Sequence, residues 1–158
     1  MVFSDKDLLH GAAIARLLLE GDALSVRCTK DHHADAYEIR SGDATLLVVF
    51  KYSTKKRSPW QFSFASPQVD ALHELRALNP TLPLAFAFVC HTDGVCGVFL
   101  EELGSIGLGI DILAGSNVSV SRPRAGSYWI SGPGRTRMRR SIPQNRWSRI
   151  LKTAPAIS

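Results

Sequence analysis

The chain has 158 residues, a length typical of one compact domain, and 45% of them are apolar, which excludes a wholly disordered chain. Its formal charge of +5 is uneven: residues 1–111 contain all 14 acids and ten bases, whereas residues 112–158 contain nine bases and no acid. No apolar run reaches the roughly 18 residues that cross a bilayer, and no basic region of a signal peptide opens the chain. We therefore expect one domain with a core at 1–111, a basic extension at 112–158 and no membrane partner.

The first expected element is a helix. Ser4 is a candidate N-cap, and Asp7, three residues later, has the spacing of a capping box. Leucine, isoleucine and alanine occupy most positions from 8 to 19, so the helix is apolar around most of its circumference. This pattern predicts a well-buried helix, which we expect to end near Gly21.

Three strands are expected next, at residues 24–28, 36–40 and 45–52. A turn signal at residues 41–43 separates the second strand from the third. The third strand is an unbroken apolar run followed by Lys51, which is typical of a central strand buried on both faces.

An edge strand, a second helix and two hairpins complete the expected elements. Residues 60–64 alternate aromatic and polar side chains, and Ser66 caps a helix whose apolar face runs from 69 to 78. The last expected strands are 84–90 with its partner 95–100, and 118–120 with its partner 128–130.

The expected fold class is therefore α/β, a mixed central sheet flanked by helices. Residues 5–91 form an αβββαβ-like core, and a β-rich basic extension follows. This order of elements, with Lys51 near the end of the third strand, resembles the core of the PD-(D/E)xK nuclease superfamily. Many restriction enzymes and Holliday-junction resolvases have that fold.

The resemblance implies a metal-dependent site. In that family, an acid on the second strand and an acid-x-Lys pair on the third converge, so that carboxylates hold a divalent metal and the lysine places the attacking water. It implies that Asp35 or Glu38 would hold Mg²⁺, that Lys51 would orient water, and that Glu20 would add a carboxylate. Val49, however, occupies the position of the family's second acid. The resemblance thus implies either an Mg²⁺-dependent nuclease or a degenerate one that binds without cleaving. The alternative is that Lys51 is a solvated end of the strand and that Asp35 and Glu38 are ordinary surface charges.

The turn at residues 41–43 determines which acid shares a face with Lys51, because opposite residues of an antiparallel hairpin point to the same side. A two-residue turn at 42–43 places Glu38 on that face, whereas a three-residue loop at 41–43 places Asp35 there. Neither register places both acids beside the lysine.

Two groups of residues are candidates for nucleic-acid binding. If residues 135–139 are extended, alternate arginines share one side at about 6–7 Å per step, close to the phosphate spacing of a single strand. The tryptophans near these bases either stack on bases or anchor the chain to the core, and the core role is favoured. The candidates are Lys55, Lys56, Arg57 and Trp60 in the first group, and Arg135, Arg137, Arg139 and Arg140 in the second.

The expected partner is DNA or RNA, with Mg²⁺ as the cofactor only if the chain cleaves. The alternative is a non-enzymatic interaction module, such as an inhibitor or an assembly subunit, whose arginines bind an acidic protein surface. Three cysteines are too few for a disulfide scaffold, which indicates a cytoplasmic protein. Cys90 and Cys96 flank a turn without the spacing of a zinc site, so we expect them in the core.

Overall fold

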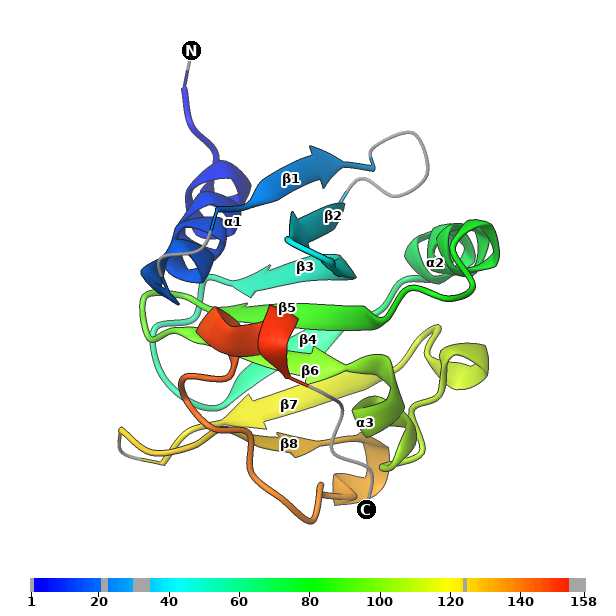
Figure 1. The fold of residues 1–158 in the computed structure, drawn as a ribbon. Coiled ribbons are helices and arrows are strands. Elements are labelled where there is room, and N and C mark those ends of the chain that lie inside the picture. Colours follow the sequence, from blue (N-terminus) through cyan, green and yellow to red (C-terminus); the bar gives the residue numbers. More distant parts are fainter. Residues whose placement is uncertain (1, 21–22, 30–34, 124, 154–158) are drawn as a thin grey trace.

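A mixed five-stranded sheet forms the centre of the molecule (Figure 1). The computed structural model describes residues 2–20, 23–29, 35–123 and 125–153, with Glu20 and Arg135 described without their side chains. Strands β3 and β5 are parallel, and the other neighbouring pairs are antiparallel, which confirms the predicted α/β class with a mixed sheet. In sheet order the strands are β1 (Ser25–Cys28), β2 (Ala36–Ser41), β3 (Ala44–Ser53), β5 (Leu84–Cys90) and β6 (Val95–Phe99).

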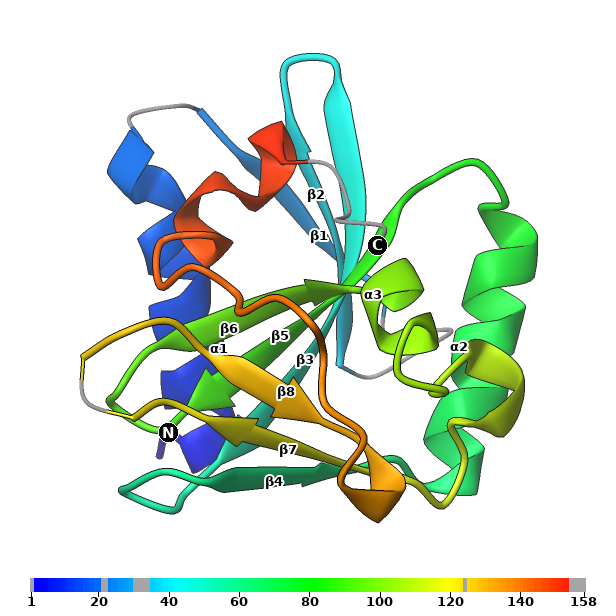
Figure 2. The same cartoon turned by 90° about the horizontal axis from the view of Figure 1, so that it is seen from below.

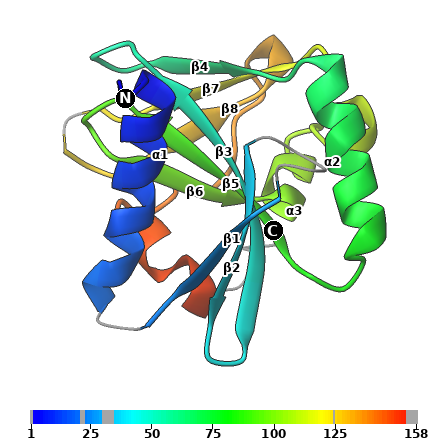
Figure 3. The same cartoon turned by 90° about the horizontal axis from the view of Figure 1, so that it is seen from above.

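Helix α1 (Asp5–Arg16) covers one face of this sheet, and α2 lies on the other side (Figure 3). The predicted capping box is present: Ser4 Oγ accepts from the Asp7 N–H at 3.1 Å, and the Asp7 carboxylate accepts from the Ser4 N–H at 3.0 Å. The Asp7 carboxylate also lies in the first turn, where the helix dipole favours negative charge. These local interactions fix the start of the helix at the predicted residue.

The outer face of α1 is exposed, so the prediction of a well-buried helix is wrong. His10 and Ala13 are the buried residues of α1, and the chain continues as a short 3₁₀ helix, η1 (Leu17–Glu20). Leu8 is 56% exposed and Leu19 is 65% exposed. Apolar periodicity shows which faces are suited to burial, but it does not fix how many layers cover the helix.

Helix α2 (Ser66–Leu78) carries the crossover from β3 to the parallel strand β5. Its N-cap is Ala65, so Ser66 is the first helical residue rather than the predicted cap. The predicted apolar face is confirmed for its buried residues Val69, Leu72 and Leu75, whereas Leu78, at the end of the helix, is exposed.

A second sheet packs against the same face of the central sheet as α2 (Figure 2). Its three strands are antiparallel and have the order β4-β7-β8. The predicted edge strand thus joins the predicted late hairpin, although the two segments are far apart in sequence. The strands are β4 (Trp60–Ser63), β7 (Asn117–Ser121) and β8 (Trp129–Ser131), and their inward side chains are Trp60, Phe62, Val118, Val120 and Ile130.

The basic extension at 112–158 contributes to both layers. Trp147 is buried on the α1 side, where its Nε1–H donates to the Ala13 carbonyl at 2.8 Å. Arg146 Nη1 lies 2.5 Å from Glu102 Oε1 in a buried ion pair. These contacts fix Arg146 and Trp147 on the core. The remaining short elements are α3 (Leu100–Gly104), η2 (Ile110–Ile112), η3 (Pro133–Arg135) and η4 (Trp147–Lys152).

Candidate nucleic-acid interface

The β2–β3 hairpin determines where Glu38 lies. Its turn holds the two residues 42–43, so Glu38 is on the face of the sheet that carries Lys51. Glu38 nevertheless pairs with a residue four positions before Lys51 along β3. Its carboxylate lies 2.7 Å from Arg27 Nη2 and 3.4 Å from Arg40 Nη2. Glu38 is therefore part of a surface ion-pair cluster, away from the lysine.

Asp35 and Lys51 line the same pocket, which has a volume of about 190 Å³. Asp35 directly precedes β2, and its carbonyl accepts from the N–H of Phe50 at 2.8 Å. Its Oδ1 forms an ion pair with Lys6 Nζ at 2.5 Å. Because Asp35 lies before the first rung of the strand, the alternation of the hairpin does not fix where its side chain points. The pocket is therefore lined by the Asp35 carboxylate, whose position the register of the β2–β3 hairpin alone does not predict.

The amine of Lys51 is fixed at the junction of β3, β4 and α2. Lys51 Nζ donates to the Ser63 carbonyl at 2.5 Å and to Gln68 Oε1 at 3.0 Å, and it lies 4.6 Å from the centroid of the Phe64 ring. Burial lowers the pKa of Lys51, and the negative charge of Asp35 partly opposes this shift. The lysine is therefore held by protein groups inside the pocket.

His10 and Gln68 also line this pocket, and the sequence analysis did not single them out. His10 is 4% exposed, and its Nδ1 is 3.2 Å from Tyr37 Oη. Burial lowers the pKa of His10, so the imidazole is neutral near pH 7. The sequence offered one signal for the burial of His10. It lies three residues before Ala13 on an apolar helix, and this spacing puts both residues on one face.

The residues at this pocket do not fit a catalytic Mg²⁺ site. Val49 is 2% exposed and packs in the core, and Asp35 is the carboxylate that lines the pocket among the described residues. Within residues 2–20, 23–29, 35–123 and 125–153, no three His, Cys, Asp or Glu side chains gather as a metal site. The side chain of Glu20 lies outside the described part. Hard cations such as Mg²⁺ need several oxygen ligands, and a single ion-paired carboxylate does not supply them.

The second sheet combines two segments of the chain that contain bases and no acids. Strand β4 comes from residues 44–69, which hold four bases and no Asp or Glu. Strands β7 and β8 come from residues 112–158, which hold nine bases and no Asp or Glu. Pairing of β4 with β7 therefore brings these two acid-free segments together in one sheet. Their bases do not all lie at this sheet, because Lys51 lies in the pocket and Arg146 pairs with Glu102.

The β3–β4 loop presents two of its predicted basic residues to solvent. Lys56 and Arg57 are exposed, and no described residue forms an ion pair with them. Lys55 Nζ donates to the Pro59 carbonyl at 2.6 Å, and the Lys55 carbonyl accepts from Trp60 Nε1 at 2.9 Å. Trp60 is 1% exposed, so it has the favoured core role and offers no ring face to a base.

The predicted arginine stripe is shorter than expected. Arg135 ends the 3₁₀ helix η3, so the extended run starts after it; its side chain lies outside the described part. Arg137 and Arg139 are exposed on either side of Met138, which is 6% exposed and points inward. Arg140 is exposed as well. The alternation thus holds for two arginines rather than three.

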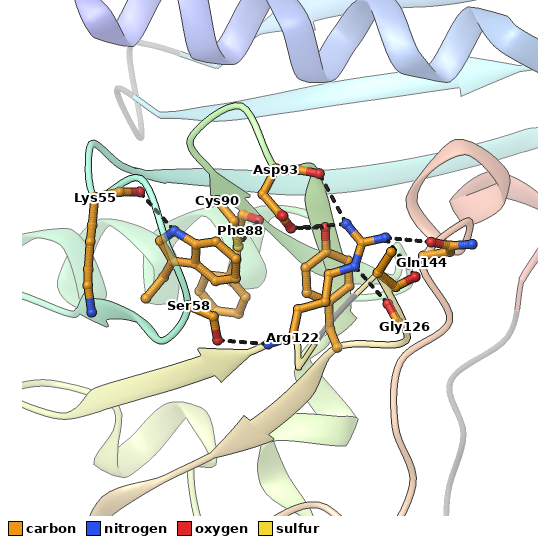
Figure 4. A network of polar contacts seen from close by, with 11 residues as sticks. Lys55, Ser58, Phe88, Cys90, Asp93, Arg122, Gly126 and Gln144 are labelled. Carbon is orange, nitrogen blue, oxygen red and sulfur yellow. Dashed lines mark hydrogen bonds and ion pairs between the residues drawn. The ribbon is translucent and has the colours of Figure 1, made fainter.

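The guanidinium of Arg122 is engaged in hydrogen bonds within the protein (Figure 4). Its guanidinium donates to Asp93 Oδ2 at 3.0 Å, to the Gly126 carbonyl at 2.7 Å and to Gln144 Oε1 at 2.5 Å. Its Cζ also lies 5.0 Å from the centroid of the Tyr128 ring. Arg122 therefore ties the β5–β6 turn to the β7–β8 connection and is not a free contact for a phosphate.

Comparisons of the chain with protein-family models, with curated proteins and with solved structures give no significant match. No helix among the described residues is long and apolar enough to span a membrane. Cys90 and Cys96 are buried, as expected for core cysteines, whereas Cys28 is exposed.

Proposed function

We propose that this protein binds nucleic acid through the exposed basic residues that flank the second sheet and that its nuclease-like core does not cleave. The observation that carries the proposal is the pairing of β4 with β7, which joins two acid-free segments. Binding to phosphates depends on such clustered Lys and Arg side chains. Among the described residues of these segments, the exposed charges of Lys56, Arg57, Arg137, Arg139 and Arg140 are available for it.

The core supports a relationship to the PD-(D/E)xK superfamily. Its order is α1, β1, β2, β3, α2 and β5, with β4 inserted before α2, and Lys51 lies near the end of β3 as the resemblance requires. Val49 and the ion pairs of Glu38 favour a core that retains this framework without the carboxylates for metal-dependent cleavage.

A salt titration with labelled DNA and RNA tests the binding proposal. We expect retention at low salt, with an affinity that falls by about 0.7–0.9 log units per log unit of salt for each phosphate contact. The double variant Lys56→Gln/Arg57→Gln should reduce this slope by about 1.5. Arg27→Gln/Arg40→Gln removes the same charge beside Glu38 and should leave the slope unchanged.

Two further arms complete the test. Polyglutamate of matched charge should bind the protein more weakly than DNA and RNA do. If polyglutamate binds equally well or more tightly, the result favours an acidic protein surface as the partner. Absence of binding to DNA and RNA at low salt would refute the proposal. Labelled substrates should stay intact with Mg²⁺ or Mn²⁺, and cleavage that is lost in Lys51→Ala would overturn the degenerate assignment.

A further inference from the structure

The strand residues on the outer face of the second sheet carry no charge. In Figure 2 its three strands lie toward the viewer, between α1 and α2. The side chains of this face are four serines, Gln61, Asn117 and Trp129, because they alternate with the buried inward residues of each strand. Gln61 Nε2 donates to Ser119 Oγ at 3.1 Å, which links β4 to β7 across the face. The face therefore offers neutral hydrogen-bonding groups and one aromatic ring.

Trp129 stands out among the three tryptophans. Trp60 and Trp147 are 1% and 2% exposed, whereas Trp129 is only partly buried. Arg137 Cζ lies 3.9 Å from the centroid of the Trp129 ring, so a cation covers part of the ring. An aromatic ring beside a guanidinium is the combination that stacks unpaired bases and contacts their phosphates.

The basic β3–β4 loop lies at the same end of the sheet as Trp129. Trp129 pairs with Ser121, and Trp60 pairs with Val120, so Trp129 is level with the residue that precedes β4. The sheet is about 10 Å wide from β4 to β8, because neighbouring strands are about 4.8 Å apart. A strand of nucleic acid crossing this face would meet Arg137 at one edge and Lys56 and Arg57 at the other.

We propose that a single-stranded nucleic acid lies across the outer face of the β4-β7-β8 sheet and stacks a base on Trp129. This inference rests on the proposed nucleic-acid function. Charge complementarity selects a polyanion, because Arg137, Lys56 and Arg57 flank the face and the segments that build the sheet contain no acid. The face favours a single strand, since stacking on a side chain requires an unpaired base. A duplex would instead be read by an element that enters its major groove.

Intrinsic fluorescence provides a direct test, because Trp129 is the tryptophan that solvent partly reaches. A thymidine oligomer of about twelve nucleotides should quench the emission and bind at least about tenfold more tightly than a duplex of equal length at the same salt. Trp129→Ala should weaken binding of the oligomer by about 5- to 150-fold, whereas Trp129→Phe should keep most of the affinity and lose the quenching. Phe3→Ala removes an exposed aromatic residue elsewhere and should change neither the affinity for the oligomer nor the quenching.

The outcomes separate this inference from the proposed function. If neither the oligomer nor the duplex binds, the proposed function fails. If both bind equally well, without quenching and without an effect of Trp129→Phe or Trp129→Ala, the nucleic-acid function stands and the assignment of the face is refuted. The quenching of the wild-type protein needs no variant, so the test does not depend on Trp129→Ala folding.

Discussion

Removal of Arg146 should destabilise the protein far more than removal of an exposed arginine from the same extension. Arg146 and Glu102 have side chains that are 8% and 0% exposed, with 2.5 Å between Nη1 and Oε1. Glu102 Oε1 also accepts from the Phe99 N–H at 2.9 Å, so the carboxylate is held in place when its cation is removed. Loss of the cation from a buried ion pair costs about 3–5 kcal/mol, because the carboxylate stays desolvated without this partner.

Urea unfolding followed by circular dichroism measures this cost. Arg146→Met should lower the free energy of unfolding by about 3–5 kcal/mol, and Arg140→Met, an exposed change of the same type, should stay within about 0.5 kcal/mol. Adding Glu102→Gln to Arg146→Met should recover about 1 kcal/mol or more, because the amide carries no charge and still accepts from Phe99. If Arg146→Met costs no more than Arg140→Met, or if the two substitutions are additive, the pair does not hold the extension on the core.

Three other predictions concern packing, thiols and pH. A Cβ at Gly97 would lie 3.3 Å from Trp147 Cε3, so Gly97→Ala should cost about 1–3 kcal/mol in thermal unfolding, whereas Gly109→Ala, with no atom within 4 Å, should stay within about 0.5 kcal/mol. A thiol reagent should modify Cys28 alone in the folded protein and all three cysteines after unfolding; rapid reaction of a second thiol would contradict the burial. Burial holds the pKa of His10 below 6.5, so the folded state binds its proton less readily than the unfolded state. The free energy of unfolding should therefore fall as pH drops below about 6.5, by at most about 1.4 kcal/mol per pH unit. The same pH dependence in His10→Gln would argue against this cause.

Local patterns predicted most of the individual elements. The capping box at Ser4 and the apolar run of β3 each depend on residues that are close in sequence, so composition and spacing were sufficient. Burial of α1 was mispredicted because it depends on neighbouring layers: Leu8 and Leu19 have the residue type of a core but no layer of the described structure covers them. A local pattern shows which side chains suit burial, whereas the fold decides which of them are covered.

The candidate pocket was predicted in part for a similar reason. Register arguments apply to paired residues, and they correctly put Glu38 on the face of Lys51 for a two-residue turn. They did not show that Glu38 lies too far along the strand, or that Asp35, just before the first pair, lines the pocket of Lys51. Gln68 reaches the same amine from α2, and this contact depends on the packing of the helix on the sheet.

The basic region and the pocket are parts of one surface because both use β4. Division of the chain at residue 111 assigned the bases of 44–69 to an acidic half, since linear charge does not show that β4 pairs with β7. Gln61 lines the pocket of Lys51 and also hydrogen-bonds Ser119 on the outer face of the second sheet. The pocket and that face therefore share Gln61, so a substitution of Gln61 would change both at once.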